Sequence, residues 1–242
     1  MKDILEVVLS VKRSQFRCDD PSSDESNKEF ISIRKEILER DKHSCQYCGF
    51  TSMKFQEVHH LDDDHSNNNP SNLVTACPLC HASHHVGFSG VKGRGCLIYI
   101  DPTLELTQAE LNSIVRTLWI GEFSKDNELQ VASTSFLARL YKLSVTAKRQ
   151  IGTSSASVLG DYLLSLEDKQ YAMRSEKLKG VYFLPSKEQF QRQLTFWLNE
   201  TYKGVPSNTW KTVAEQKLTK WLENEIGDTS QERKIEYLGL QE

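Results

Sequence analysis

Four cysteines in two C-x2-C pairs carry the strongest chemical signal in the sequence. Cys45 and Cys48 form the first pair, 28 residues follow, and Cys77 and Cys80 form the second. Each short loop places two sulfurs on one side of an ion, and two loops complete a tetrahedron. We therefore expect one structural Zn2+ per chain, because four thiolates leave no position open for water or substrate. Buried apolar cysteines, the alternative, would not explain the paired spacing.

The remaining cysteines, Cys18 and Cys96, have no cysteine close to them in the sequence, and we expect them to be buried or incidental thiols. The first residues carry Asp3 and Glu6 within an apolar stretch, which makes a poor signal peptide. Nowhere do 18 apolar residues follow one another. These features predict a cytoplasmic chain with reduced thiols and no transmembrane segment.

Histidines provide a second chemical signal. Six of the seven histidines lie within residues 57–85, the stretch that also contains Cys77 and Cys80. A neutral imidazole can take a proton from water near pH 7, and several imidazoles together can bind a divalent cation. The sequence is therefore compatible with a hydrolytic metal centre or with histidines that only support the fold.

Acidic residues surround these histidines. Residues 41–81 contain two lysines against five acids, and Asp62, Asp63 and Asp64 are adjacent. A phosphodiester backbone would be repelled there, unless one of the acids helps to bind a second cation. A solvated acidic loop is the simpler alternative.

Periodic patterns predict the elements that position these side chains. Apolar residues at helical spacing predict a helix from about Phe30 to Asp41. The stretch "KFQEVHH" predicts a strand that leads to two histidines. The stretch "LCHASHHVGF" predicts a short helix on which His81, His84 and His85 share a face.

The same residues resemble a known family. "IRKEILERDKHSCQYCGF", "EVHH" and "NLVTACPLCH" occur in this order over residues 34–86, and they look like the zinc-stapled HNH endonuclease motif, a ββα-metal module. The resemblance implies that His60 is a general base oriented by Asn72. It also implies that His59 and His81 bind a catalytic divalent ion, with His85 as an auxiliary ligand.

Three histidines, His43, His65 and His84, match no position of that motif. We expect each of them on an exposed loop or helix, without a role as a ligand.

Beyond this region the sequence predicts a mainly helical domain with a few short strands, and hence an α+β fold. "CLIYI" and "GVYFLP" are the strand candidates. Thr107 with Glu110, and Ser186 with Gln189, have the spacing of capping boxes that begin helices. "GFSGVKGRG" has four glycines in nine residues and predicts a flexible turn.

We predict four segments along the chain. They are an N-terminal segment (1–33) with a polar linker at 18–29, an HNH-like zinc-binding module (34–95), a mainly helical domain (96–204), and a C-terminal amphipathic helix and tail (205–242).

Composition argues mildly against nucleic acid as a partner. The formal net charge is −3, from 30 basic and 33 acidic residues, so the chain has no large positive field to attract phosphates. The basic residues of the helical domain alternate with acids, as on solvated helix faces.

A wider resemblance covers about residues 3–200. "ILEVVLSVKRSQFR" and "GRGCLIYIDPTLELTQAELNSIVRTLW" resemble the DotN (IcmJ) family of the Dot/Icm type IV secretion coupling complex. This implies a noncatalytic scaffold that binds the C-terminal extension of the coupling ATPase DotL, beside DotM and the IcmS–IcmW adaptors. It implies no small-molecule substrate and a place at the cytoplasmic side of the inner membrane. A metal-dependent HNH endonuclease that hydrolyses DNA, with His60 as the base, is the alternative.

Overall fold

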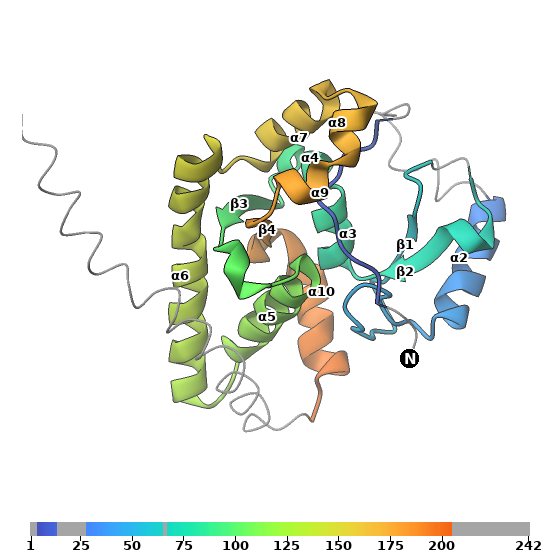
Figure 1. Cartoon of the computed structure of the whole chain (residues 1–242). Helices are drawn as coiled ribbons and strands as arrows, with labels where there is room; N and C mark the ends of the chain where they lie inside the picture. Colours follow the sequence, from blue (N-terminus) through green and yellow to red (C-terminus); the bar gives the residue numbers. More distant parts are fainter. Residues whose placement is uncertain (1–3, 14–27, 65–66, 205–242) are drawn as a thin grey trace, which may run out of the picture.

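A computed structural model describes residues 4–13, 28–64 and 67–204 of the 242-residue chain (Figure 1). Helices predominate in this part, together with two antiparallel sheets of two strands each, β1-β2 and β3-β4. The predicted α+β class is confirmed. Among the described helices, none has both the length and the apolar character needed to cross a membrane.

Residues 28–64 and 67–84 form a compact unit, whose helix α2 and strands β1 and β2 lie at one end of the molecule and whose helix α3 lies nearer the middle (Figure 1). Its elements are α2 (Lys28–Arg40), β1 (Glu57–His60), the 3-10 turn η1 (Pro70–Asn72), β2 (Leu73–Ala76) and α3 (Pro78–His84). In the β1-β2 pair, His59 lies opposite Val74 and His60 opposite Leu73. A small apolar core joins α2 to this pair through Ile37 and Val58. The predicted helix, strand and second helix are all present.

Asp41 connects the end of α2 to β2. Its side chain is buried and accepts hydrogen bonds from the backbone N–H of Thr75, at 2.9 Å, and from two nitrogens of Arg40. Since β2 leads directly to the second cysteine pair, this carboxylate helps to set the position of both cysteine loops.

The glycine-rich stretch is mostly helical, so the predicted flexible turn is wrong. Residues Val86–Val91 form α4, which lies against α7 (Ala156–Ser165). A Cβ atom added at Gly90 would lie 2.1 Å from the backbone nitrogen of Ser157, and one at Gly160 would lie 2.4 Å from the Cα of Gly87. These glycines allow two helix backbones to approach closely, a role that local composition does not reveal.

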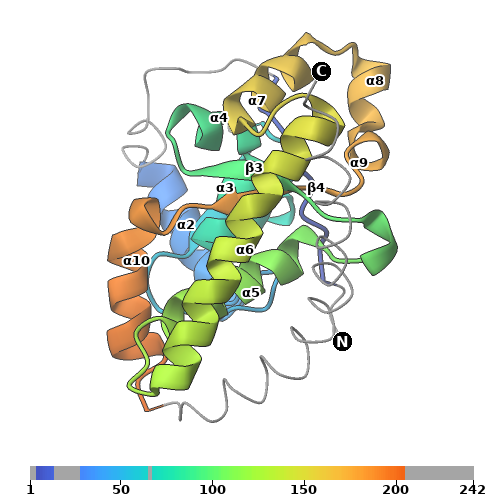
Figure 2. The ribbon, with the colours of Figure 1, turned by 90° about the vertical axis from the view of Figure 1, so that its left-hand side faces the viewer.

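Several helices of the rest of the molecule pack against the second sheet. β3 (Gly95–Tyr99) pairs with β4 (Val181–Pro185), and both predicted strands are confirmed. The long helix α6 (Asn127–Ile151) crosses this sheet, as Figure 2 shows. The helix α5 (Gln108–Gly121) begins with the predicted capping box of Thr107 and Glu110.

The capping box predicted at Ser186 and Gln189 is not formed. The Ser186 hydroxyl donates to the carboxylate of Glu188 at 2.6 Å, and the next residues form a 3-10 turn, η3 (Lys187–Phe190), before α10 (Gln191–Phe196). The α-helix therefore begins at Gln191, later than expected. A π-helical turn, η4 (Trp197–Thr201), follows. The other short elements are η2 (Pro102–Leu104), α8 (Asp168–Ala172) and α9 (Arg174–Lys177).

Residues 4–13 run between the two sheets (Figure 1). Ser10 donates its backbone N–H to the carbonyl of His84 at 2.8 Å, and its hydroxyl accepts from Arg174. One hydrophobic core includes Val7, Cys77 and Trp119, and thus residues from the first three predicted segments. The segment boundaries themselves stay predictions. Most of the predicted linker, and the predicted helix and tail at 205–242, lie outside the described residues.

Candidate metal centres

The four paired cysteines come together in one cluster. Their sulfurs all lie within 4.8 Å of one another, and Cys45, Cys77 and Cys80 are buried. Cys77 is the N-cap of α3, and its sulfur accepts from the backbone N–H of Cys80 at 3.5 Å. Gly49 has a φ of 72°, which closes the turn after the first pair. Four thiolates in this arrangement could hold a metal ion with no position open to solvent.

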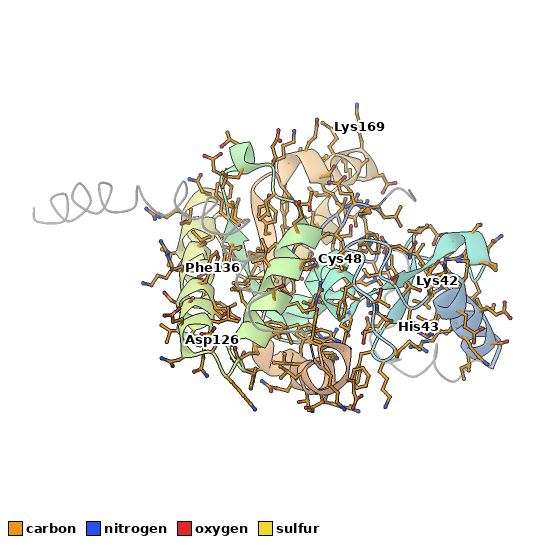
Figure 3. All side chains as sticks on the ribbon, turned by 90° about the horizontal axis from the view of Figure 1, so that it is seen from below. Lys42, His43, Cys48, Asp126, Phe136 and Lys169 are labelled. Atoms are coloured by element: carbon orange, nitrogen blue, oxygen red, sulfur yellow. The ribbon has the colours of Figure 1, made fainter. Side chains whose placement is uncertain are left out.

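Two side chains from α5 also reach this cysteine cluster. The amide of Asn112 donates to the Cys80 sulfur at 3.5 Å, and a guanidinium nitrogen of Arg116 lies 4.0 Å from the Cys48 sulfur. Figure 3 places Cys48 in the middle of the molecule, between Lys42 and His43 on one side and Phe136 of α6 on the other. Neither residue was predicted from the sequence. The available signal was the spacing of Asn112 and Arg116, four residues apart beside the apolar positions of the same predicted helix.

Neighbouring side chains stabilise the buried positive charge of Arg116. Its guanidinium lies 3.9 Å from the centre of the Phe50 ring and donates to the Tyr202 hydroxyl at 3.0 Å. Burial opposes the charged form, but the neighbouring Tyr202 and Cys48 outweigh it and raise the pKa of Arg116. A divalent ion with four thiolates carries a net charge of about −2, so one buried guanidinium offsets part of it.

The cysteine sulfurs do not ionise independently of one another. Hydrogen bonds from Cys45, Cys77 and Cys80 hold the pKa of Cys48 well below its usual value, and Arg116 lowers it further. Burial and the neighbouring sulfurs raise the pKa of Cys77 well above its usual value. A cation must displace the protons that remain, so its binding is expected to strengthen as the pH rises.

Three histidines form a second cluster. His59 on β1, His81 on α3 and His85 just after α3 each offer a nitrogen within 4.8 Å of the others. Their ring centres are 4.6 to 5.4 Å apart. The structure thus brings together the three histidines proposed as ligands of a second ion.

Glu57 supports this second cluster, a role that was not predicted from the sequence. Its carboxylate accepts a hydrogen bond from Nδ1 of His81. Desolvation opposes the charged form of Glu57, but the contact with His81 outweighs it and lowers the pKa of the carboxyl group. A histidine that donates from one nitrogen to a carboxylate presents the other nitrogen to a metal ion. The signal was the position of Glu57 on the same strand, two residues before His59.

His60 and Asn72, the residues proposed for catalysis, both contact the loop between β1 and β2. His60 is 2% exposed, its ring stacks on Phe30 with 5.8 Å between ring centres, and its Nε2 lies 3.1 Å from the side-chain oxygen of Asn68. The amide of Asn72 donates to Asp62 at 2.8 Å and to the backbone carbonyl of Asn67 at 3.0 Å. Asn72 therefore stabilises the loop that contains the three adjacent acids. The role of His60 as a general base stays a prediction.

His84 is not exposed, so that expectation is wrong. It is 8% exposed, and its Nε2 lies 3.2 Å from a carboxylate oxygen of Asp63. Tertiary contacts bury it, because α3 packs against β1. His43 is half-buried, whereas His65 lies outside the described residues.

Comparisons with known proteins agree with this arrangement. A model of the HNH endonuclease family matches residues 45–87. A probable HNH endonuclease of Lactococcus phage SK1 is 36% identical over 76 residues, which cover 28% of this chain and 81% of the phage protein.

A second relative matches far more of the chain. The type 4 apparatus protein DotN of Legionella pneumophila is 32% identical over 171 residues, which cover 69% of this chain and 78% of that protein. The aligned length is well beyond that of the HNH match, so it includes much of the helical part that contacts the cysteine cluster. With a zinc-type cysteine cluster, an HNH module and this extended similarity, the chain belongs to the DotN family.

Proposed function

We propose that this chain is a noncatalytic subunit of a type IV secretion apparatus, in which an HNH-like module serves as a scaffold. The similarity to the type 4 apparatus protein DotN over 171 residues carries this proposal. The contacts from Asn112 and Arg116 to the cysteines support it, because they join the module to the helical part of the chain.

The proposed binding partner is the C-terminal extension of the coupling ATPase DotL, beside DotM and the IcmS–IcmW adaptors. The cargo would be effector proteins, and the chain would lie at the cytoplasmic face of the inner membrane through this complex. The net charge of −3 gives no general attraction for nucleic acid, which agrees with a protein partner.

The proposed cofactor is one structural Zn2+ per chain, bound by Cys45, Cys48, Cys77 and Cys80. Burial of three of these residues and the mutual approach of all four sulfurs suit a closed tetrahedral site. Zinc would supply folding free energy, on the order of 10 kcal/mol in small zinc peptides.

A metal-dependent HNH endonuclease is the second candidate function, and the histidine cluster with Glu57 favours it. In that function His59, His81 and His85 would hold a catalytic divalent ion, and His60 would take a proton from water. The burial of His60 and the exposed Asp62 and Asp64 beside it disfavour the approach of a phosphodiester.

Two measurements with the full chain separate these functions. Co-purification with the C-terminal extension of DotL is expected to succeed and to be retained in His60→Ala. Folded protein that binds no component of the coupling complex would contradict the scaffold. Divalent-dependent nicking of plasmid DNA that disappears in His60→Ala would establish the endonuclease instead.

A further inference from the structure

A third group of metal-binding side chains lies beside the histidine cluster. His59, Asp63 and His84 each offer one ligand atom, and these atoms lie within 4.8 Å of one another. The rings of His59 and His84 have their centres 4.2 Å apart, closer than His59 is to His81 or His85. The HNH motif assigns no role to Asp63 or His84.

Of the three adjacent acids, Asp63 is the one that faces the histidines. The Asp62 carboxylate accepts from the amides of Asn67 and Asn72, and Asp64 is exposed. The side chain of Asp63 is only 17% exposed and lies against His84. The acidic loop therefore directs one carboxylate inward.

His84 is available as a ligand through Nε2. Its side chain is only 11% exposed, and this nitrogen lies beside the Asp63 carboxylate. Nδ1 points away from Asp63, so Nε2 is the nitrogen that can share an ion with that carboxylate.

The distance between Asp63 and His84 also suits ligands of a common ion. Their N···O separation is 3.2 Å. Two ligands at tetrahedral angles, each about 2.0 to 2.1 Å from zinc, are about 3.3 to 3.4 Å apart. The two atoms are therefore close enough to bind one ion.

We propose that His59, Asp63 and His84 bind a divalent cation of the zinc class, separately from the set of His59, His81 and His85. Two imidazoles and one carboxylate are a common ligand set for such an ion. Both sets include His59, so the two sites share this residue. The proposal concerns this site alone and does not depend on a role in secretion.

The test is a titration of the full chain, its cysteine zinc retained, with additional Zn2+ followed by calorimetry. Asp63→Asn and His84→Ala are expected to weaken binding of the added ion about tenfold or more. Asp64→Asn makes the same charge change on the neighbouring exposed acid and should leave binding within about twofold. His81→Ala and His85→Ala should also leave it nearly unchanged. Retention of one zinc per chain shows that each variant is folded.

Three outcomes would overturn the proposal. The first is no binding of a second zinc ion to the unmodified chain. The second is binding that His81→Ala or His85→Ala removes while Asp63→Asn does not, which places the ion in the nuclease-like set. The third is equal loss in all four variants, which indicates one ion shared by both sets. If His84→Ala does not fold, the comparison of Asp63→Asn with Asp64→Asn decides the test, because both residues lie in the same loop.

Discussion

The side-chain amide of Asn112 donates a hydrogen bond to the sulfur of Cys80 over 3.5 Å. This contact links α5, in the helical part, to the cysteine cluster. Asn112 is fully buried and also donates to Ser83 on α3 and accepts from Gln108. The metal-binding loops are therefore supported by side chains from well outside the HNH match at residues 45–87. Zinc binding and the position of α5 should depend on each other.

Replacing Arg116 by methionine should weaken zinc binding. Methionine keeps much of the buried volume but removes the cation 4.0 Å from the Cys48 sulfur. Loss of such a group beside metal ligands typically reduces metal affinity about 10- to 100-fold. Competition with a coloured chelator measures the change. Arg192→Met, at an exposed position, is the matched control, and equal affinity in both variants would contradict the role of Arg116.

Zinc binding should release protons, and its affinity should fall with decreasing pH. The raised pKa of Cys77 means that its thiol holds a proton near neutral pH, which zinc must displace, whereas the lowered pKa of Cys48 favours the thiolate form of that side chain. Protons compete more strongly as the pH falls, so zinc is retained at high pH and lost at low pH. In Arg116→Met the pKa of Cys48 should rise, so more protons should leave per zinc bound. Calorimetry in buffers of different ionisation enthalpy counts these protons. A count in Arg116→Met equal to that of the unmodified chain would refute the electrostatic role of Arg116.

Cys45→Ser and Cys77→Ser should each destabilise the whole chain, because the cysteines belong to the same core as Trp119. Each variant removes one of four thiolates, and the free energy of zinc binding is largely folding free energy. We expect a lower melting temperature and loss of the bound zinc. His60→Ala should keep one zinc per chain, and loss of zinc in that variant would count against a closed cysteine site.

The sequence predicted the cysteine cluster because ligand spacing within each pair is local information. It did not predict Asn112 or Arg116, whose contacts with cysteines connect positions 32 and 68 residues apart. His84 was misjudged for a related reason, since it is buried by elements that meet only in the folded chain. The strands "CLIYI" and "GVYFLP" were recognisable by their apolar runs, but their pairing with each other was not.

The glycine-rich helix α4 gives a prediction about packing. Gly90→Ala would place a Cβ atom 2.1 Å from the backbone nitrogen of Ser157, so α4 and α7 would have to separate. We expect a loss of about 1 to 3 kcal/mol in the free energy of unfolding, or more if the helices cannot shift. Gly93→Asn is a suitable control, because nothing lies within 4 Å and asparagine tolerates the φ of 63° there. Urea unfolding measures both, and equal stabilities would contradict the close approach of the helices.

Asp41→Asn should destabilise the compact unit at neutral pH. The buried carboxylate accepts from Arg40 and from the backbone of Thr75, and hydrogen bonds to a charged group each contribute about 1.5 to 3 kcal/mol. We expect a loss within that range in urea unfolding at pH 7. Asp101→Asn is the control, since Asp101 is exposed and its hydrogen bonds with Thr103 are local, and it should change stability much less.

The effect of Asp41→Asn should also depend on pH, with a definite sign. Burial opposes the charged form of Asp41, but the contacts with Arg40 and Thr75 outweigh it and lower its pKa below the ordinary 3.8. A carboxyl group with a lowered folded-state pKa stabilises the protein above its unfolded-state pKa, and this contribution is lost as the pH falls toward the folded-state value. The difference in unfolding free energy between wild type and Asp41→Asn should therefore be constant from about pH 8 to 5 and decrease below about pH 4. Measurement with zinc in excess limits the separate effect of metal loss. A difference that grows as the pH falls would mean that Asp41 is not stabilised as a carboxylate.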